Sequence, residues 1–176
     1  MEKDCIALIG FMCTGKTTVG KLLKDYLGSS YKFIETDQII SEMAGKSISR
    51  IFLEDGEQRF REHEIEACKY VSKLKRTVIS CGGGIVLNHI NIKNLKKNCY
   101  IILLNATSDE IYKRALKDGI ENRPVINKED PKQEMEKILE FRKPYYELAA
   151  DDFIETTGKK IEDIAKEIIL KIHLKT

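Results

Sequence analysis

Short apolar runs alternate along the chain with longer stretches in which apolar residues recur every three or four positions. The first run, 5–9, is followed by Gly10, and its length and composition are typical of a strand that is buried on both faces. Four further segments predict strands, the last of them only weakly. They cover residues 32–34, 77–80, 100–104 and 153–154.

The stretches between these runs predict helices. Between 16 and 27 the apolar residues fall at helical spacing, and Gly28 follows as a stop signal. Asp130 followed by Pro131 is the pattern of a helix N-cap with proline at the first helical position, so we expect a helix from there to about Tyr146. Further helices are expected after Ser47 as N-cap through residue 53, over 57–74, after Ser108 as N-cap, and over 160–174.

This alternation of strands and helices predicts a parallel sheet with helices on both faces. We therefore expect a single α/β domain over residues 1–176, a three-layer α/β/α sandwich around a five-stranded parallel sheet. In such folds ligands bind at the carboxyl ends of the strands. The polar segment 118–130 reads as a long loop, and loops of that length in compact domains are usually functional or mobile.

The overall composition argues against several classes of protein. The 176 residues carry 30 Lys and Arg against 28 Asp and Glu, a net charge of +2, so no general attraction to nucleic acid or to a membrane surface is expected. No apolar run approaches the roughly 18 residues of a membrane span, and the first five residues are too acidic for a signal peptide. Five scattered cysteines without a CxxC pair indicate free thiols in a reducing cytoplasm. Nothing in the pattern suggests an obligate oligomer, so we expect a monomer.

The segment 10–17 carries the most specific chemical signal. It fits G-x-x-x-x-G-K-[ST] and lies between a buried strand and a helix. In that context the backbone N–H groups of the loop and of the helix N-terminus converge on one anion. Lys16 would reach the β- and γ-phosphates of a nucleotide, and the Thr17 hydroxyl would bind Mg²⁺. Because a chance match in this context is rare, we interpret the segment as a nucleotide-binding P-loop rather than an ordinary glycine-rich turn.

Two carboxylates follow the second expected strand at the same edge of the sheet. Between them, Glu35 and Asp37 could supply a partner for magnesium-bound water and an acceptor or base for a substrate hydroxyl. Ser80, at the end of the third strand, could hydrogen-bond a magnesium-bound water. Alternatively, Asp37 caps the helix that follows, and the two roles are compatible.

Arginines supply candidate partners for an acidic substrate. Arg61 and Glu64 are spaced i,i+3, so Glu64 could direct the guanidinium toward a carboxylate ligand, although such a charged segment is more often a solvated helix face. Arg123, in the long loop, and Arg142, on the next helix, could close over phosphate, although an arginine at either position, taken alone, is more often a surface residue.

Three consecutive glycines, Gly82, Gly83 and Gly84, follow the third strand. Glycines at the carboxyl end of a strand indicate either a close approach of the backbone to a ligand or a tight turn. We favour the ligand, because the P-loop lies at this same edge of the sheet.

Taken in order, these segments resemble the shikimate kinase family, small P-loop kinases that are similar to nucleoside monophosphate kinases. The resemblance covers most of the chain, and the ordered set is far more specific than any one member. It rests on the P-loop 10–18, the pair Glu35 and Asp37, Gly56-Glu57-x-x-Phe60-Arg61-x-x-Glu64, Ser80-x-Gly82-Gly83-Gly84, Arg123-Pro124 and Arg142-x-Pro144-x-Tyr146. It implies a P-loop NTPase fold, ATP as co-substrate, Mg²⁺, and phosphorylation of the 3-hydroxyl of shikimate to shikimate 3-phosphate in aromatic amino acid (chorismate) biosynthesis.

The same resemblance implies roles for the matching residues. ATP would be bound by Cys13, Thr14, Gly15, Lys16, Thr17, Thr18 and Arg123, with Lys16 and Arg123 also catalytic. Shikimate would be bound by Asp37, which would also act as base, and by Arg61, Gly82, Gly83, Gly84 and Arg142. Glu64 would orient Arg61, and Phe52 and Phe60 would wall the pocket. The shikimate-binding region would span about 35–64 and a lid about 117–130.

Two positions depart from the family pattern. Glu35 stands where an aspartate is usual and is one methylene longer, which bears on its role near magnesium. Cys13 stands where a third P-loop glycine is common, so we expect slightly different backbone angles there.

Two other functions fit parts of the sequence. A kinase for another small polyol acid, such as gluconate, would share the scaffold, but the Arg61/Glu64 pair and the three glycines speak against it. A GTPase switch would account for 127–130, which fit the guanine-reading pattern N-K-x-D. That pattern should follow a buried strand, whereas here only Val125-Ile126 precede it, directly after a proline. Asp130 is better explained as a helix N-cap.

Overall fold

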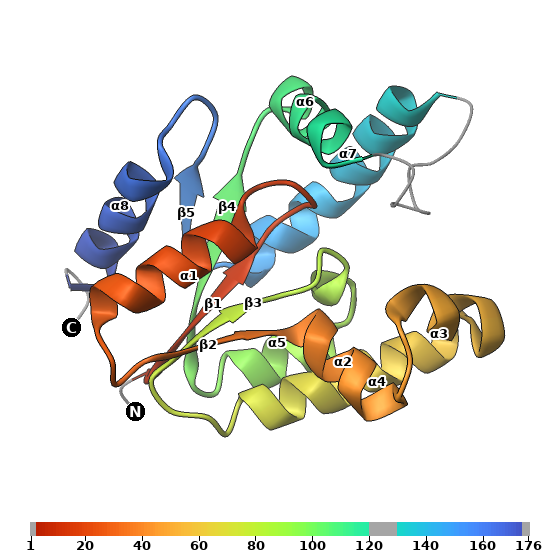
Figure 1. The fold of residues 1–176 in the computed structure, drawn as a ribbon, viewed down its shortest axis with the longest axis horizontal. Coiled ribbons are helices and arrows are strands. Elements are labelled where there is room, and N and C mark those ends of the chain that lie inside the picture. The colour runs from red at the N-terminus through yellow and green to blue at the C-terminus, as the bar shows by residue number, and fades with distance from the viewer. Residues whose placement is uncertain (1–2, 120–129, 174–176) are drawn as a thin grey trace.

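Five parallel strands form the centre of the molecule, in the order β2-β3-β1-β4-β5 (Figure 1). The computed structural model describes residues 3–119 and 130–173. The strands are β1 (Cys5–Ile9), β2 (Lys32–Glu35), β3 (Thr77–Ser80), β4 (Cys99–Asn105) and β5 (Asp152–Glu155). All four neighbouring pairs are parallel, so the five-stranded parallel sheet expected from the sequence is confirmed.

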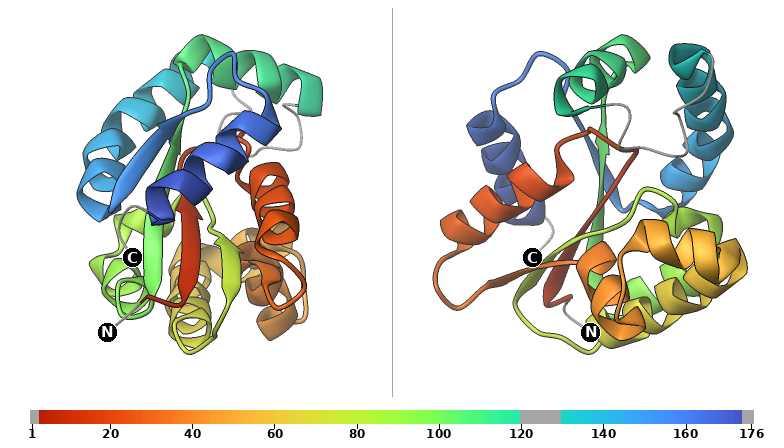
Figure 2. Two further views of the ribbon diagram at one scale, coloured as in Figure 1. Left: turned by 90° about the vertical axis from the view of Figure 1, so that its left-hand side faces the viewer. Right: turned by 45° about the vertical axis from the view of Figure 1, so that its right-hand side comes forward.

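Helices cover both faces of this sheet, which confirms the three-layer sandwich (Figure 2). The described helices are α1 (Lys16–Leu27), α2 (Thr36–Ala44), α3 (Ile48–Glu54), α4 (Gly56–Val71), α5 (His89–Leu95), α6 (Ser108–Asp118), α7 (Pro131–Ala149) and α8 (Ile161–His173), with a 3₁₀ turn η1 (Ile85–Leu87) after β3. Helices α1 and α8 pack together on one face, and α4, α5 and α7 lie on the other (Figure 2). Among the described helices, none is long and apolar enough to cross a membrane.

The central strand β1 contributes to two separate cores because its side chains alternate between the faces of the sheet. Cys5, Ala7 and Ile9 belong to the cluster under α4, α5 and α7, and Ile6 and Leu8 to the cluster under α1 and α8. Every residue of the strand is buried. Burying one Leu or Ile side chain completely stabilises the fold by about 1.5–3 kcal/mol, so this strand anchors the segment that follows it.

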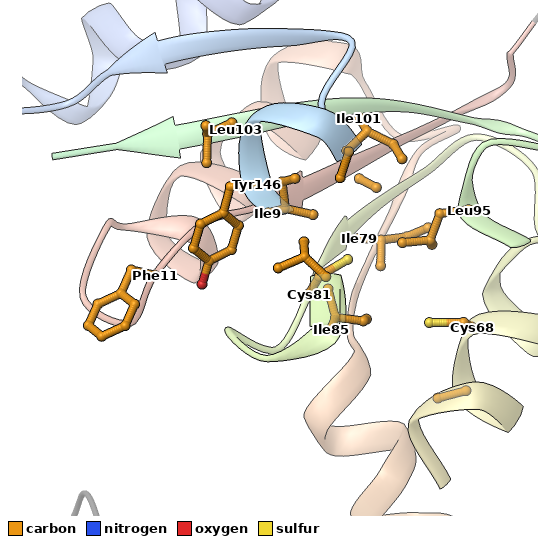
Figure 3. Close-up of a cluster of buried hydrophobic side chains, with 14 of the residues drawn as sticks. Ile9, Phe11, Cys68, Ile79, Cys81, Ile85, Leu95, Ile101, Leu103 and Tyr146 are labelled. Carbon is orange, nitrogen blue, oxygen red and sulfur yellow. The ribbon is translucent and has the colours of Figure 1, made fainter. Parts of the chain in front are cut away.

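The larger cluster reaches the carboxyl edge of the sheet (Figure 3). There Phe11, two residues after the end of β1, and Cys81, directly after β3, are both buried. The Tyr146 ring lies among the apolar side chains, with its hydroxyl oxygen at the end away from Leu103 (Figure 3). The segments after β1 and β3 are therefore fixed by the core itself.

The helix boundaries agree with the sequence where capping is strong. Asp130 accepts a hydrogen bond from Gln133 N at 3.0 Å and Pro131 opens α7, as expected, although the helix runs on to Ala149. The expectation of Ser108 as N-cap is wrong, because Thr107 caps α6. The helix expected over 57–74 ends at Val71, and the hydrophobic pattern does not predict α5, whose seven residues span only about two turns.

Candidate active site

The segment between β1 and α1 has the backbone of an anion-binding loop. Gly10, Cys13 and Gly15 all have positive φ angles, of 143°, 59° and 93°. A Cβ atom on Gly10 would collide with the carbonyl oxygen of Leu104, so only glycine fits there. The conformation at Cys13 is one that a glycine would adopt freely, so the departure from the usual P-loop sequence leaves the left-handed turn in place.

The left-handed conformation of Cys13 gives a stability prediction. We expect Cys13→Gly to raise the free energy of unfolding by about 0.5–1 kcal/mol, because a side chain in this region costs about 1–2 kcal/mol and the extra chain entropy of glycine offsets part of that gain. Urea unfolding monitored by circular dichroism measures the change. Cys13→Ala is the matched control: it removes the thiol but keeps the Cβ, and we expect no gain. Equal stabilisation by both variants would show that backbone strain is not the cause.

Two side chains hold the loop from inside. Lys16 Nζ donates to the carbonyl oxygens of Gly10, at 2.9 Å, and Phe11, at 2.7 Å. The buried Thr14 hydroxyl donates to the same Phe11 oxygen at 2.9 Å. The loop is therefore already curled around the Lys16 ammonium, which lies among the residues that line the cavity at this edge.

Oxygen ligands gather beside the first turn of α1. Thr17 Oγ1 donates to Glu35 Oε1 at 2.5 Å and lies 3.5 Å from Ser80 Oγ. Hydroxyl and carboxylate oxygens suit Mg²⁺, which keeps several water ligands and is usually held by one or two side chains together with substrate phosphates. These three residues therefore fit the magnesium site that the sequence predicts, and the extra methylene of Glu35 does not keep it from Thr17.

Asp37 lines the same cavity as Lys16. Helix α2 begins at Thr36 and Glu35 occupies the N-cap position, so the expectation that Asp37 caps the helix is wrong. Solvent reaches the Asp37 side chain, yet the surrounding protein raises the pKa of its carboxyl above the usual value by desolvation, with Lys16 opposing this effect and Glu35 adding to it. A carboxylate of raised pKa is a stronger base.

The three glycines after β3 bring the predicted substrate residues together. A Cβ atom on Gly82 would lie 2.5 Å from Asp37 Oδ1, one on Gly84 2.7 Å from Arg61 Nη1, and one on Gly83 3.8 Å from Arg142 Nη1. Side chains at the first and last positions would therefore displace a carboxylate and a guanidinium. The glycines let three charged groups from different parts of the chain pack against one short stretch of backbone.

Arg61 is held by two carboxylates on its own helix. Its guanidinium donates to Glu64 Oε2 at 2.6 Å and to Glu57 Oε1 at 2.9 Å. The Glu64 side chain is only 1% exposed, and burial raises the pKa of its carboxyl although Arg61 opposes the shift. The pairing of Arg61 with Glu64 that the spacing suggested is therefore present, and it fixes the direction of the guanidinium.

The two predicted wall residues lie behind Arg61. The rings of Phe52 and Phe60 are 4.6 Å apart, and the Arg61 guanidinium carbon lies 5.1 Å from the centre of the Phe60 ring. Phe60 is buried, whereas the Phe52 side chain is 38% exposed. The pair supports the arginine from the side of α3 and α4.

A cavity of about 280 Å³ collects most of the predicted residues. Its lining consists of Met12, Cys13, Gly15, Lys16, Thr17, Thr18, Glu35, Asp37, Ser80, Cys81, Gly82, Gly83 and Asp118. Arg61, Gly84 and Arg142 adjoin it through the glycine segment, and Phe52 and Phe60 lie farther out. Arg123 and most of the expected lid lie outside the described residues.

Other residues that shape the site carry no clear signal in the sequence. Arg114 on α6 donates to the carbonyl oxygen of Cys13 at 3.3 Å and to that of Thr156 at 3.1 Å, so it ties the P-loop to the segment after β5. The buried Thr36 hydroxyl accepts from Gly82 N at 2.9 Å. Thr36 could have been noticed because it stands between two predicted carboxylates, whereas nothing local marks Arg114.

Known proteins share this arrangement. A family model described as "Shikimate kinase" matches residues 12–173. Shikimate kinases from Caldanaerobacter subterraneus subsp. tengcongensis and Thermodesulfovibrio yellowstonii are each 44% identical to the chain over 164 residues, which is 93% of this chain and 93% and 92% of theirs. The solved shikimate kinase from Acinetobacter baumannii in complex with shikimate superimposes with a TM-score of 0.91, at 30% identity, over 99% of this chain and 95% of its own.

These matches extend over nearly the whole chain, so they include both the P-loop and the glycine segment after β3. The fold is that of the P-loop NTPases, and the sequence-based resemblance is confirmed. The chain therefore belongs to the shikimate kinase family, the ATP-dependent kinases of shikimate in aromatic amino acid biosynthesis.

Proposed function

We propose that this site transfers the γ-phosphoryl group of ATP to the 3-hydroxyl of shikimate, giving shikimate 3-phosphate and ADP. One observation carries the assignment: Asp37, Arg61 and Arg142 all pack against three glycines that border the cavity of the P-loop. A base and two guanidinium groups next to a phosphate site suit an acceptor that has both a hydroxyl and a carboxylate.

The nucleotide is held by the loop and its flanks. The backbone N–H groups at the start of α1 and the Lys16 ammonium bind the β- and γ-phosphates, and Lys16 leaves the carbonyl oxygens of Gly10 and Phe11 to do so. A cavity of about 380 Å³ on the other side of the loop, lined in part by Thr18, Arg114 and Lys159, supports placing the nucleoside there. Arg123 is the second cation assigned to the phosphates.

Thr17, Glu35 and Ser80 are the residues that would hold magnesium, Thr17 directly and the other two through water. Bound there, Mg²⁺ would counter negative charge on the phosphates. The Thr17 hydroxyl must then turn from Glu35 toward the metal, and Glu35 is placed to accept hydrogen bonds from its waters.

Shikimate is oriented by its carboxylate and activated at its hydroxyl. Arg61 and Arg142 pair with the carboxylate, which fixes the ring with its hydroxyls toward Asp37. Asp37 accepts the proton of the 3-hydroxyl as its oxygen attacks the γ-phosphorus, and Lys16 stabilises the charge on the transferred group. Positioning and charge stabilisation supply most of the catalysis, as in other phosphoryl transfers.

We propose further that the enzyme works as a monomer in the cytoplasm. All the groups assigned to the reaction come from one chain. Its five cysteines are free thiols, which a reducing compartment preserves.

A coupled ADP-release assay with a panel of acceptors and nucleotides tests the assignment. We expect turnover with ATP and shikimate, and none above the acceptor-free rate with gluconate. A reaction without acceptor measures the hydrolysis of ATP by water. Turnover with gluconate but not with shikimate, or use of GTP with no use of ATP, would contradict the proposal.

A further inference from the structure

Two side chains of α7 donate to the same backbone oxygen of the glycine segment. Tyr146 Oη lies 2.5 Å from the carbonyl oxygen of Gly83, and Arg142 Nη1 lies 3.3 Å from it. The two residues are one helical turn apart, so they point from the same face of α7. The shorter bond is the one from tyrosine, and the longer one comes from the guanidinium assigned to the substrate.

The surroundings of Tyr146 keep its hydroxyl in place as a hydrogen-bond donor to the Gly83 carbonyl oxygen. Its side chain is 3% exposed, and its ring lies in the apolar cluster under the sheet (Figure 3). Burial raises the pKa of Tyr146 to about 12, with Arg142 opposing the shift, so the hydroxyl keeps its proton at neutral pH. The rigid ring and the fixed helix hold the hydroxyl in one place.

Arg142, in contrast, makes a longer bond to this oxygen than Tyr146 does. Its guanidinium carbon lies 5.8 Å from the centre of the Phe11 ring, and its bond to Gly83 is long. A half-buried carbonyl that loses its donors costs about 1–3 kcal/mol. If Arg142 were the sole donor to the Gly83 carbonyl oxygen, this oxygen and the substrate carboxylate would compete for the guanidinium.

We propose that Tyr146 is a positioning residue: by satisfying the carbonyl of Gly83, it fixes the glycine segment and leaves the Arg142 guanidinium available for the substrate carboxylate. This inference rests on the proposed role of Arg142. The proposal also gives a role to Tyr146, which lies four residues after Arg142 on α7 and has no part in the chemistry assigned above.

The variant Tyr146→Phe tests the proposal, because it keeps the ring and removes only the donor. We expect the KM for shikimate to rise about 3- to 10-fold, the effect of one neutral hydrogen bond, with the KM for ATP and kcat within twofold of wild type. Both KM values are independent of the fraction of enzyme that is folded. Tyr145→Phe is the matched control: that ring is 40% exposed and packs on Phe141, and we expect no change.

A double-mutant cycle with Arg142→Ala separates positioning from packing. On the Arg142→Ala background, which itself should raise the KM for shikimate, adding Tyr146→Phe should raise that KM by a smaller factor than it does in the wild type. Full additivity of the two changes, or a rise in both KM values with Tyr146→Phe, would overturn the proposal for Tyr146 alone. No effect of Arg142→Ala on the KM for shikimate would overturn both this proposal and the assigned role of Arg142.

Discussion

Replacing Lys16 by methionine is expected to lower kcat by about 10²- to 10³-fold. That is the usual effect of removing one group that stabilises transition-state charge, equivalent to about 2.7–4 kcal/mol. Methionine preserves most of the side chain's length but can neither neutralise the γ-phosphate nor donate hydrogen bonds. Steady-state ADP release at saturating shikimate and ATP measures the effect. We expect the fold to persist, because the loop keeps its positive-φ turns and the bond from Thr14 to Phe11.

Lys24→Met provides the control on the same helix. Lys24 forms a surface ion pair with Asp25 at 3.0 Å, and such pairs contribute little. We expect kcat to stay at the wild-type value. A Lys16→Met enzyme with a circular dichroism spectrum like wild type and a kcat within tenfold of it would refute the role of Lys16 in transfer.

Replacing Arg61 by alanine is expected to raise the KM for shikimate by about 10- to 100-fold and to leave the KM for ATP nearly unchanged. Hydrogen bonds to charged groups contribute about 1.5–3 kcal/mol, and each 1.4 kcal/mol is a factor of ten in affinity. The loss also leaves the Glu64 carboxylate buried without its guanidinium partner. Initial-rate measurements over a grid of both substrates separate the two KM values.

Arg59→Ala is the matched control on the same helix. The Arg59 side chain is 55% exposed and pairs with Glu62, which is 48% exposed. We expect both KM values to remain those of wild type. Equal increases in the two KM values for Arg61→Ala would contradict a role confined to the acid substrate.

The fold was predictable because its signals are local. Strands β1 and β4 are apolar runs, and a helix such as α7 has an Asp-Pro start that acts through adjacent residues. The exceptions have local causes too. Helix α5 is too short for a helical period to show, and Thr107 and Ser108 are both acceptable N-caps, so sequence alone does not choose between them.

The site was predictable only in part, because motifs name residues but not their contacts across the chain. The P-loop and the i,i+3 pair of Arg61 and Glu64 are local and appear as expected. The hydrogen bond from Tyr146 to Gly83 and the one from Arg114 to the Cys13 carbonyl join residues that lie 63 and 101 positions apart. Such contacts depend on strand order, which the sequence pattern leaves open.

The position of β1 at the middle of the sheet has a further consequence. On one side of it, the segments after β2 and β3 hold Asp37 and the three glycines assigned to the acid, and on the other, α6 and α8 flank the cavity assigned to the nucleoside. If the two reactants bind as assigned, they occupy separate cavities on either side of the P-loop and can be bound at once. We therefore expect direct transfer in a ternary complex, with inversion of configuration at phosphorus, because the attacking and leaving oxygens of phosphoryl transfer are roughly in line.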